Sequence, residues 1–89
     1  MAHKYGSKIY HNSFSSAVQM AQSDAEANGY EVDEQSWFNT VAMGQGRPKQ
    51  GETTRFSVEL LKDGKPSKKQ LHVQVYGMEH AYELNHYIN

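Results

Sequence analysis

The chain has 89 residues, a formal net charge of −1 and no cysteine, and 37% of its residues are hydrophobic. A chain of this length forms one domain with a modest core, so we expect a single domain over residues 1–89. The composition excludes disulfides and thiolate metal sites, and no apolar run approaches the roughly 20 residues that span a bilayer. The near-neutral charge argues against a dedicated electrostatic nucleic-acid binder. Because the first residues lack the apolar core of a signal peptide, we expect a cytoplasmic protein without a membrane partner.

Residues 1–11 show little periodicity, and we expect either a weakly ordered segment or a short edge strand there. A helix is predicted over residues 12–28, because its apolar side chains form one stripe: Phe14, Ala17, Val18, Ala21 and Ala25. Asn12 or Ser13 offers a side-chain oxygen for the N-cap, and Gly29 suits the left-handed residue that ends many helices. Alanines dominate the stripe, so the helix is expected to lie close to a sheet.

The middle of the chain predicts a connector, a strand and a long loop. Glu31, Asp33 and Glu34 lack the glycine and the oxygen-ligand spacing of a calcium loop, so a solvated connector is expected. Residues 37–43 alternate as a strand does, with sizeable side chains on both faces, and the alternation leaves open which face is buried. Three glycines and a proline mark residues 44–52 as an exposed loop, which lacks the ending of a phosphate loop.

Residues 53–87 show the most regular alternation of apolar and polar side chains, which predicts half-buried strands. The run Asp63-Gly64-Lys65-Pro66-Ser67 interrupts the alternation and favours a turn. A turn centred between Lys65 and Pro66 predicts three apolar cross-strand pairs: Leu60 with Leu71, Val58 with Val73, and Phe56 with Val75. The same register puts Glu59 opposite His72 and Arg55 opposite Tyr76 on the other face.

Residues 82–88 allow two interpretations. Tyr82, Leu84 and Ile88 alternate with polar residues as in a strand, whereas Ala81, Leu84 and Ile88 also have helical spacing. We prefer a strand because Tyr, Asn, His and Ile are mediocre helix formers. The predicted fold is therefore α+β, with one N-terminal helix packed on one face of a four-stranded antiparallel meander sheet formed by residues 36–89.

Residues that carry chemistry in other proteins form no recognised motif in this chain. The five histidines include no closely spaced pair of the HxH or HExxH kind, and no serine lies in a Gly-x-Ser-x-Gly elbow. In the predicted sheet His72 approaches Glu59 and Tyr87, which is enough for a hydrogen-bonded cluster. We expect no catalytic residue, no cofactor and no metal, and we expect structural or surface roles for the histidines.

The face of the sheet away from the helix is the strongest candidate for binding. It is expected to carry Trp37, Arg55, Glu59, His72, Gln74, Tyr76 and Tyr87. Exposed aromatic side chains beside arginine are enriched at recognition surfaces, although a mixed surface of ordinary polarity has the same appearance. Basic side chains concentrate in two turns, where solvated loops are the simplest interpretation: Arg47 and Lys49 in one, and Lys65, Lys68 and Lys69 in the other.

Several stretches of the chain resemble one group of small proteins. These stretches are Gly29-Tyr30-Glu31-Val32, Trp37, the run from Leu60 to Pro66, the run from Leu71 to Tyr76, and Tyr82-Glu83-Leu84-Asn85. Over most of its length after Phe14, the chain is similar to proteins of the tailed phages of marine cyanobacteria and of ocean metagenomes. That group has no assigned activity, so the resemblance implies a viral origin and the cytoplasm of an infected host cell, without a mechanism.

The favoured function is non-catalytic binding through the open sheet face, with either a second copy or another protein as partner. The alternative is binding of single-stranded nucleic acid, with Trp37, Tyr76 and Tyr87 stacking on bases and Arg47, Arg55 and Lys69 meeting phosphates. A small enzyme is the third hypothesis, and it would need a deep pocket that joins His72 to a carboxylate.

Overall fold

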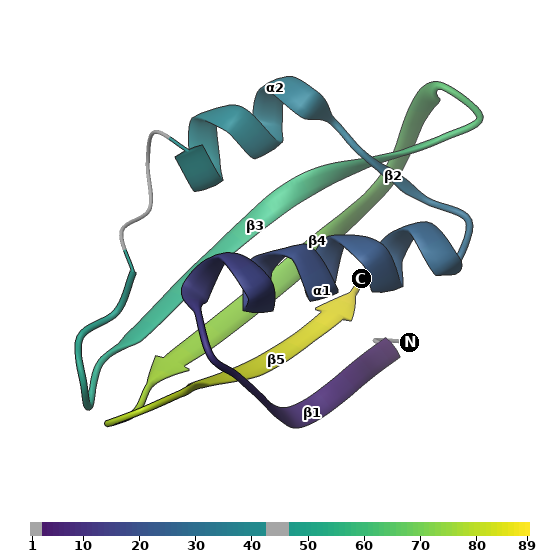
Figure 1. The fold of residues 1–89 in the computed structure, drawn as a ribbon. Coiled ribbons are helices and arrows are strands. Elements are labelled where there is room, and N and C mark those ends of the chain that lie inside the picture. Colours follow the sequence, from purple (N-terminus) through teal and green to yellow (C-terminus); the bar gives the residue numbers. More distant parts are fainter. Residues whose placement is uncertain (1–2, 43–46) are drawn as a thin grey trace.

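The computed structural model describes residues 3–42 and 47–89, with the side chains of residues 10–40 and 47–89. The elements follow in the order β1 (His3–His11), α1 (Phe14–Ala27), β2 (Glu31–Val32), α2 (Glu34–Trp37), the π-helical segment η1 (Phe38–Ala42), β3 (Thr53–Lys62), β4 (Lys65–Gly77) and β5 (Tyr82–Ile88) (Figure 1). The predicted α+β class is confirmed. None of the helices in these ranges is long and apolar enough to cross a membrane.

The sheet is antiparallel, and its strands lie in the order β1-β5-β4-β3-β2. The first and last strands are neighbours, with His3 opposite Ile88 and His11 opposite Tyr82. The N-terminal segment is therefore an edge strand, one of the two structures expected for it, and β5 confirms the strand predicted over residues 82–88. The prediction of four strands is wrong, because β1 and the two-residue β2 join the sheet while residues 37–42 are helical.

The strand predicted over residues 37–43 is replaced by the end of α2 and by η1, and Met43 lies outside the described residues. The N-cap of α2 is Asp33, whose carboxylate accepts hydrogen bonds from two backbone N–H groups of the next turn at 3.0 and 3.4 Å. Such capping favours a helix, and a stretch of this length is too short for the spacing of its apolar side chains to separate helix from strand.

The β3–β4 hairpin is confirmed, but its turn lies two residues earlier than predicted. Asp63 and Gly64 form a two-residue turn with φ angles of 54° and 76°. Two consecutive positive φ angles are typical of a type I′ turn, whose twist matches that of the paired strands. Lys62 and Lys65 are consequently opposite each other at the end of the hairpin.

A bulge in β4 then changes the register. Lys68 has a φ of 63°, and the Ser67 hydroxyl donates to the Leu60 carbonyl oxygen at 2.7 Å inside the bulge. Beyond the bulge the pairs are Val58 with Leu71, Phe56 with Val73, and Thr54 with Val75, so the predicted register is wrong by two residues. Because strand side chains alternate with a period of two, this even shift leaves each side chain on its predicted face.

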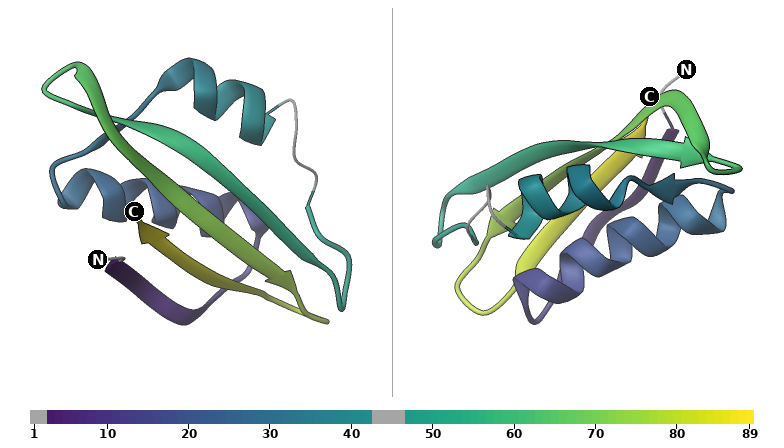
Figure 2. Two further views of the ribbon diagram at one scale, coloured as in Figure 1. Left: turned by 180° about the vertical axis from the view of Figure 1, so that it is seen from behind. Right: turned by 90° about the horizontal axis from the view of Figure 1, so that it is seen from above.

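The predicted helix is confirmed as α1, which packs on the sheet through its alanine stripe. Ala17, Ala21 and Ala25 have no exposed surface. The buried sheet residues of the same core are Val32, Phe56, Val58, Leu60, Leu71, Val73, Val75, Leu84 and Ile88. Figure 2 shows α1 and α2 on the same side of the sheet, so that the opposite face carries no helix.

Substitution of Ala21 by leucine should destabilise the fold, because three additional carbon atoms must enter the contact between α1 and the sheet. We expect Ala21→Leu to lower the free energy of unfolding by about 1–3 kcal/mol, as measured by urea unfolding. Ala27→Leu, at an exposed position of the same helix, is the matched control and should change it by less than about 0.5 kcal/mol. Equal effects of the two substitutions would contradict the close packing of α1.

Candidate binding face

The open face of the sheet consists of the β3, β4 and β5 side chains that point away from α1. Its members are Arg55, Ser57, Glu59, Gln70, His72, Gln74, Tyr76, Glu83, Asn85 and Tyr87. The left view in Figure 2 is directed at this face, with the strands in front of both helices. The register places these side chains in rows across the strands, and two neighbouring rows define the candidate site.

The first row, called the Arg55 row, joins Arg55, Gln74 and Asn85. Arg55 donates from Nε to Oε1 of Gln74 at 2.9 Å, which holds the exposed guanidinium against β4. A guanidinium has five N–H donors, and within the described residues no other hydrogen bond from this group is found. The row therefore offers a fixed positive charge and unused donors to a partner.

The second row, called the His72 row, joins Ser57, His72 and Tyr87. His72 Nδ1 and Ser57 Oγ lie 2.7 Å apart, within hydrogen-bond distance. The imidazole also stacks on the Tyr87 ring, with 4.7 Å between ring centroids and 29° between the planes. The predicted proximity of His72 to Tyr87 is confirmed, whereas Glu59 instead accepts a hydrogen bond from Gln70 at 2.9 Å.

A hollow of about 410 Å³ lies across the two rows. It is lined by Arg55, Phe56, Ser57, His72, Val73, Gln74, Asn85 and Tyr87. A volume of a few hundred cubic ångströms is at the lower end of ligand pockets, roughly 300–1,000 Å³. Because its members lie on three adjacent strands of one sheet, the hollow is suited to a side chain or a planar group that enters from outside.

The structure brings together six of the seven residues predicted for the binding face. Trp37 is the exception: it lies in α2 on the helical side of the sheet and packs against the core. There it lines a second hollow of about 400 Å³ with Phe14 and Arg47, among other residues. Its predicted place on the open face depended on the strand that α2 and η1 replace.

Ser57 and Asn85 are members of the site that the sequence analysis did not single out. Both are small polar residues, and residues of this type do not by themselves indicate a binding site. The alternation of side chains in β3 and β5 did place them on the open face. Only the register reveals that Ser57 lies beside His72 and that Asn85 lies beside Gln74.

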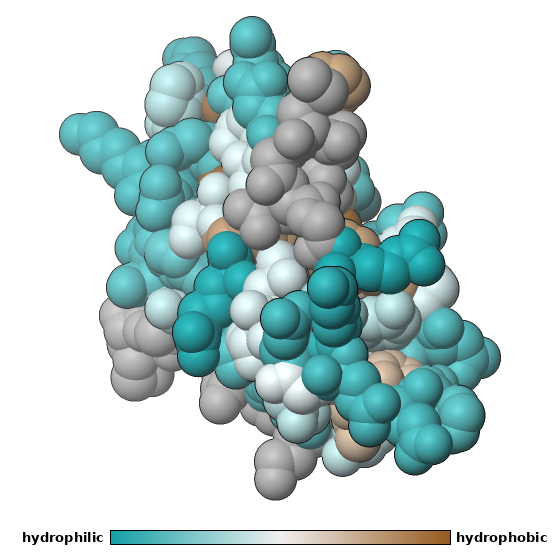
Figure 3. All heavy atoms as spheres, turned by 90° about the vertical axis from the view of Figure 1, so that its left-hand side faces the viewer, coloured by the Kyte–Doolittle hydropathy of each residue, from teal (hydrophilic) through white to brown (hydrophobic). Residues whose placement is uncertain are grey.

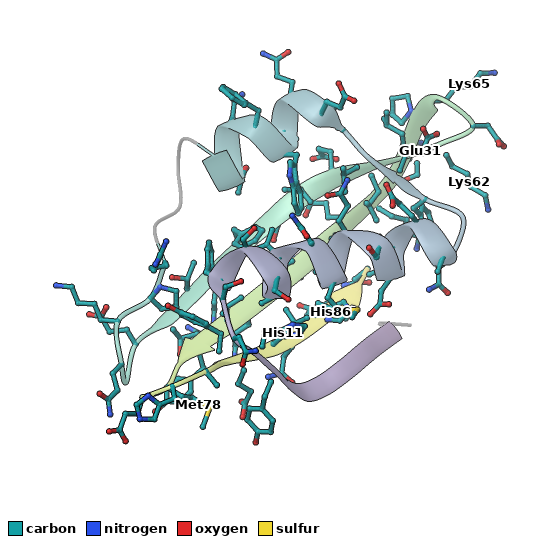
Figure 4. All side chains as sticks on the ribbon, in the orientation of Figure 1. His11, Glu31, Lys62, Lys65, Met78 and His86 are labelled. Carbon is teal, nitrogen blue, oxygen red and sulfur yellow. The ribbon has the colours of Figure 1, made fainter. Side chains whose placement is uncertain are left out.

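The five basic residues predicted in turns are exposed but do not gather around the site. Lys65, Lys68 and Lys69 lie at the tip of the β3–β4 hairpin, where Figure 4 shows Lys65. Arg47 and Lys49 precede β3 and lie at the other end of the hairpin, where backbone hydrogen bonds link this segment to Gly77. The view in Figure 3 shows a mostly hydrophilic side of the molecule, as expected for solvated loops.

The helical side of the sheet holds two buried histidines, His11 and His86. His86 Nε2 lies 2.9 Å from Asp24 Oδ2, and His11 Nδ1 lies 3.1 Å from Ser16 Oγ. Burial lowers the pKa of His86 below its ordinary value, although the hydrogen bond that Asp24 accepts from the ring and the negative charge of Asp24 act in the opposite direction. No group of three or more potential metal ligands is found within the ranges that the structure describes.

The protein is an α+β domain in which helices cover one face of the sheet and leave the other uncovered. Comparison of the chain with models of protein families, with curated proteins and with solved structures gave no match. The geometry and chemistry of the open face are therefore the basis of the function proposed below.

The stacking of His72 on Tyr87 should be measurable as a coupling energy. We expect a double-mutant cycle of His72→Ala and Tyr87→Ala to give a coupling of about 0.5–1 kcal/mol in the free energy of unfolding. A parallel cycle of His72→Ala with Tyr10→Ala, an exposed tyrosine of β1, serves as the control and should show no coupling. A zero value in both cycles would mean that the His72 row is not preorganised.

Proposed function

We propose that the chain is a non-catalytic binding protein whose open face binds a second copy of the same chain. The observation that carries this proposal is that one uncovered face bears both a hollow and exposed aromatic side chains. Tyr76 and Tyr87 expose 38% and 36% of their surface, and aromatic side chains in such positions are typical anchors of protein interfaces. A face with projections and a hollow of comparable size can be complementary to itself.

Self-association of this kind needs a surface that is complementary under a two-fold rotation. An axis along β4, in the plane between two facing sheets, would place β3 of one copy over β5 of the other. In the His72 row, Tyr87 of each copy then lies over Ser57 of the second copy. The Tyr87 ring of each copy would thus enter the hollow of the other copy beside its small Ser57 side chain. This contact occurs twice, once on each side of the axis.

The same rotation pairs opposite charges. Arg55 of one copy lies over Asn85 of the second copy, one row away from that copy's Glu83. Neighbouring rows are two residues apart, or about 7 Å along a strand, which is within the reach of an arginine side chain. Two symmetric Arg55–Glu83 pairs would fix the register of the two sheets, as charge pairs do in other interfaces.

The resemblance to phage proteins supports a cellular setting for this association. A viral origin would place the protein in the cytoplasm of an infected cell. A protein of the host or of the phage is the other occupant that the open face would accept, and the measurement of mass below separates the two cases.

One observation favours a second candidate function, the binding of single-stranded nucleic acid. The stacked pair of His72 and Tyr87 lies near Arg55, and bases stack on such platforms beside basic side chains. We favour self-association because the lysines lie at the hairpin tip and do not follow the face as a phosphate track. Catalysis is less favoured still, because the Ser57–His72 pair has no orienting carboxylate among its described contacts.

Light scattering at low and at moderate salt tests the proposed function. We expect a mass of twice the 10.1 kDa chain at both salt concentrations, and we expect Tyr76→Ala and Tyr87→Ala to raise the dissociation constant by about tenfold or more. Phe38→Ala removes an exposed aromatic ring of η1 and is the control. A monomer under both conditions would overturn the proposal, and affinity for a labelled single strand that falls steeply with salt would then establish the second candidate.

A charge exchange tests the arrangement of the two copies. Arg55→Glu or Glu83→Arg alone places like charges together and should weaken the dimer by about tenfold, while the double substitution should restore most of the affinity. Sedimentation equilibrium would measure all three dissociation constants. If the loss of dimer affinity in the double variant equals the sum of the two single losses, the axis along β4 is contradicted. Glu79→Arg, at an exposed position of the β4–β5 turn, is the matched control.

A further inference from the structure

The buried face of the sheet contains a contact that the proposed function does not use. His86 of β5 has no exposed surface, and its Nε2 lies 2.9 Å from the Asp24 carboxylate of α1. His11, at the end of β1, is also buried and lies 3.1 Å from the hydroxyl of Ser16 in the first turns of α1. Figure 4 shows both histidines between α1 and the outer strands. The two contacts attach one helix to β5 and to β1.

Among the side chains that the structure describes, the nearest neighbours of His86 within the sheet are apolar. Across the strands it pairs with Val73 of β4 and with Tyr5 of β1, and its neighbours on the same face of β5 are Leu84 and Ile88. Of the side chains that the structure describes, Asp24 and His11 are the titratable groups that act on it. A proton on His86 would therefore place a charge in an apolar layer, opposite one partly exposed carboxylate and near a second histidine.

β1 borders this region at the edge of the sheet. It is an edge strand whose pairing partner in the sheet is β5. Its register with β5 shifts between Tyr5 and Ile9, where the β5 residues opposite are His86 and Leu84. The ladder is thus interrupted beside the buried imidazole. A disturbance at His86 therefore acts where β1 has the fewest regular backbone pairs.

We propose that His86, together with Asp24 and His11, is an acid-sensitive latch that holds α1 and β1 on the sheet. Its release at mildly acidic pH loosens the attachment of these two elements to the sheet more than the pairing of β3 with β4. The latch lies on the helical side of the sheet, so it does not depend on the proposed self-association.

The direction of the pH effect follows from the buried state of His86. Burial lowers its pKa in the folded chain, whereas the unfolded chain keeps a value of about 6.5. Between the two values the unfolded chain binds more protons, so stability falls as the pH falls. The stabilisation is complete above about pH 6.5 and is lost as the pH drops toward the pKa of the folded state.

Hydrogen exchange of individual amides tests the latch. At about pH 5, compared with about pH 7.5, and after correction for the intrinsic exchange rate, the amides of α1 and β1 should lose about tenfold more protection than those of β3 and β4. A uniform loss in all elements, or no loss at all, would overturn the proposal. The NMR titration of the His86 ring should also have a midpoint below the ordinary histidine value of about 6.5, and a midpoint at or above that value would overturn the proposal as well.

Two variants and a control assign the effect to His86. His86→Leu removes the titrating group, so the difference in amide protection between α1 and β3 should no longer depend on pH. If this variant fails to fold, Asp24→Asn keeps a hydrogen-bond partner and removes the charge, which should increase the loss of protection at low pH. His80→Gln, in the exposed turn after β4, should leave the profile unchanged. If amide protection in Asp24→Asn depends on pH in the same way as in the unsubstituted chain, the latch is contradicted.

Discussion

The burial of the apolar face of β4 against α1 is the contact on which the other features of the molecule depend. Leu71 and Val75 are fully buried at the centre of the sheet, and the alanine stripe of α1 lets the helix approach them closely. The described part of the chain contains one helix of this length, so one face of the sheet is covered by it and the other carries no helix (Figure 2). The uncovered face is consequently built of side chains that hydrogen-bond or stack across neighbouring strands, as Arg55 does with Gln74 and His72 with Tyr87.

The local patterns in the sequence predicted a large part of this architecture. The spacing of Phe14, Ala17 and Ala21 identified α1, and the alternation in β3, β4 and β5 assigned side chains to the correct faces. The candidate site was also largely predicted, because membership of a face requires only the parity of a residue within its strand. Apart from the contact of His72 with Tyr87, the exact neighbours within the site were not predicted, since the register depends on both the turn at Asp63 and Gly64 and the bulge at Lys68.

The remaining differences arise from contacts that local sequence does not encode. The pairing of β1 with β5 joins segments from the two ends of the sequence, and no local alternation reveals which distant strand is the partner. Trp37 was misplaced because the cap at Asp33, and not the spacing of the apolar residues, decides the structure of its segment. The buried position of His86 likewise depends on α1 crossing β5, which gives a histidine in an alternating strand a role that its neighbours in sequence do not suggest.

The pairing of β1 with β5 also bears on how the chain reaches its folded state. The hairpin of β3 and β4 brings together residues that are close in sequence, whereas His3 and Ile88 are paired although nearly all of the described chain separates them. Closing so long a loop costs conformational entropy before the contacts that offset this cost can form. Proteins dominated by such pairings therefore fold slowly. During synthesis β1 is made before its partner strand β5, with the other elements of the sheet between them. The nascent chain therefore carries β1 as an unpaired edge until β5 has been made.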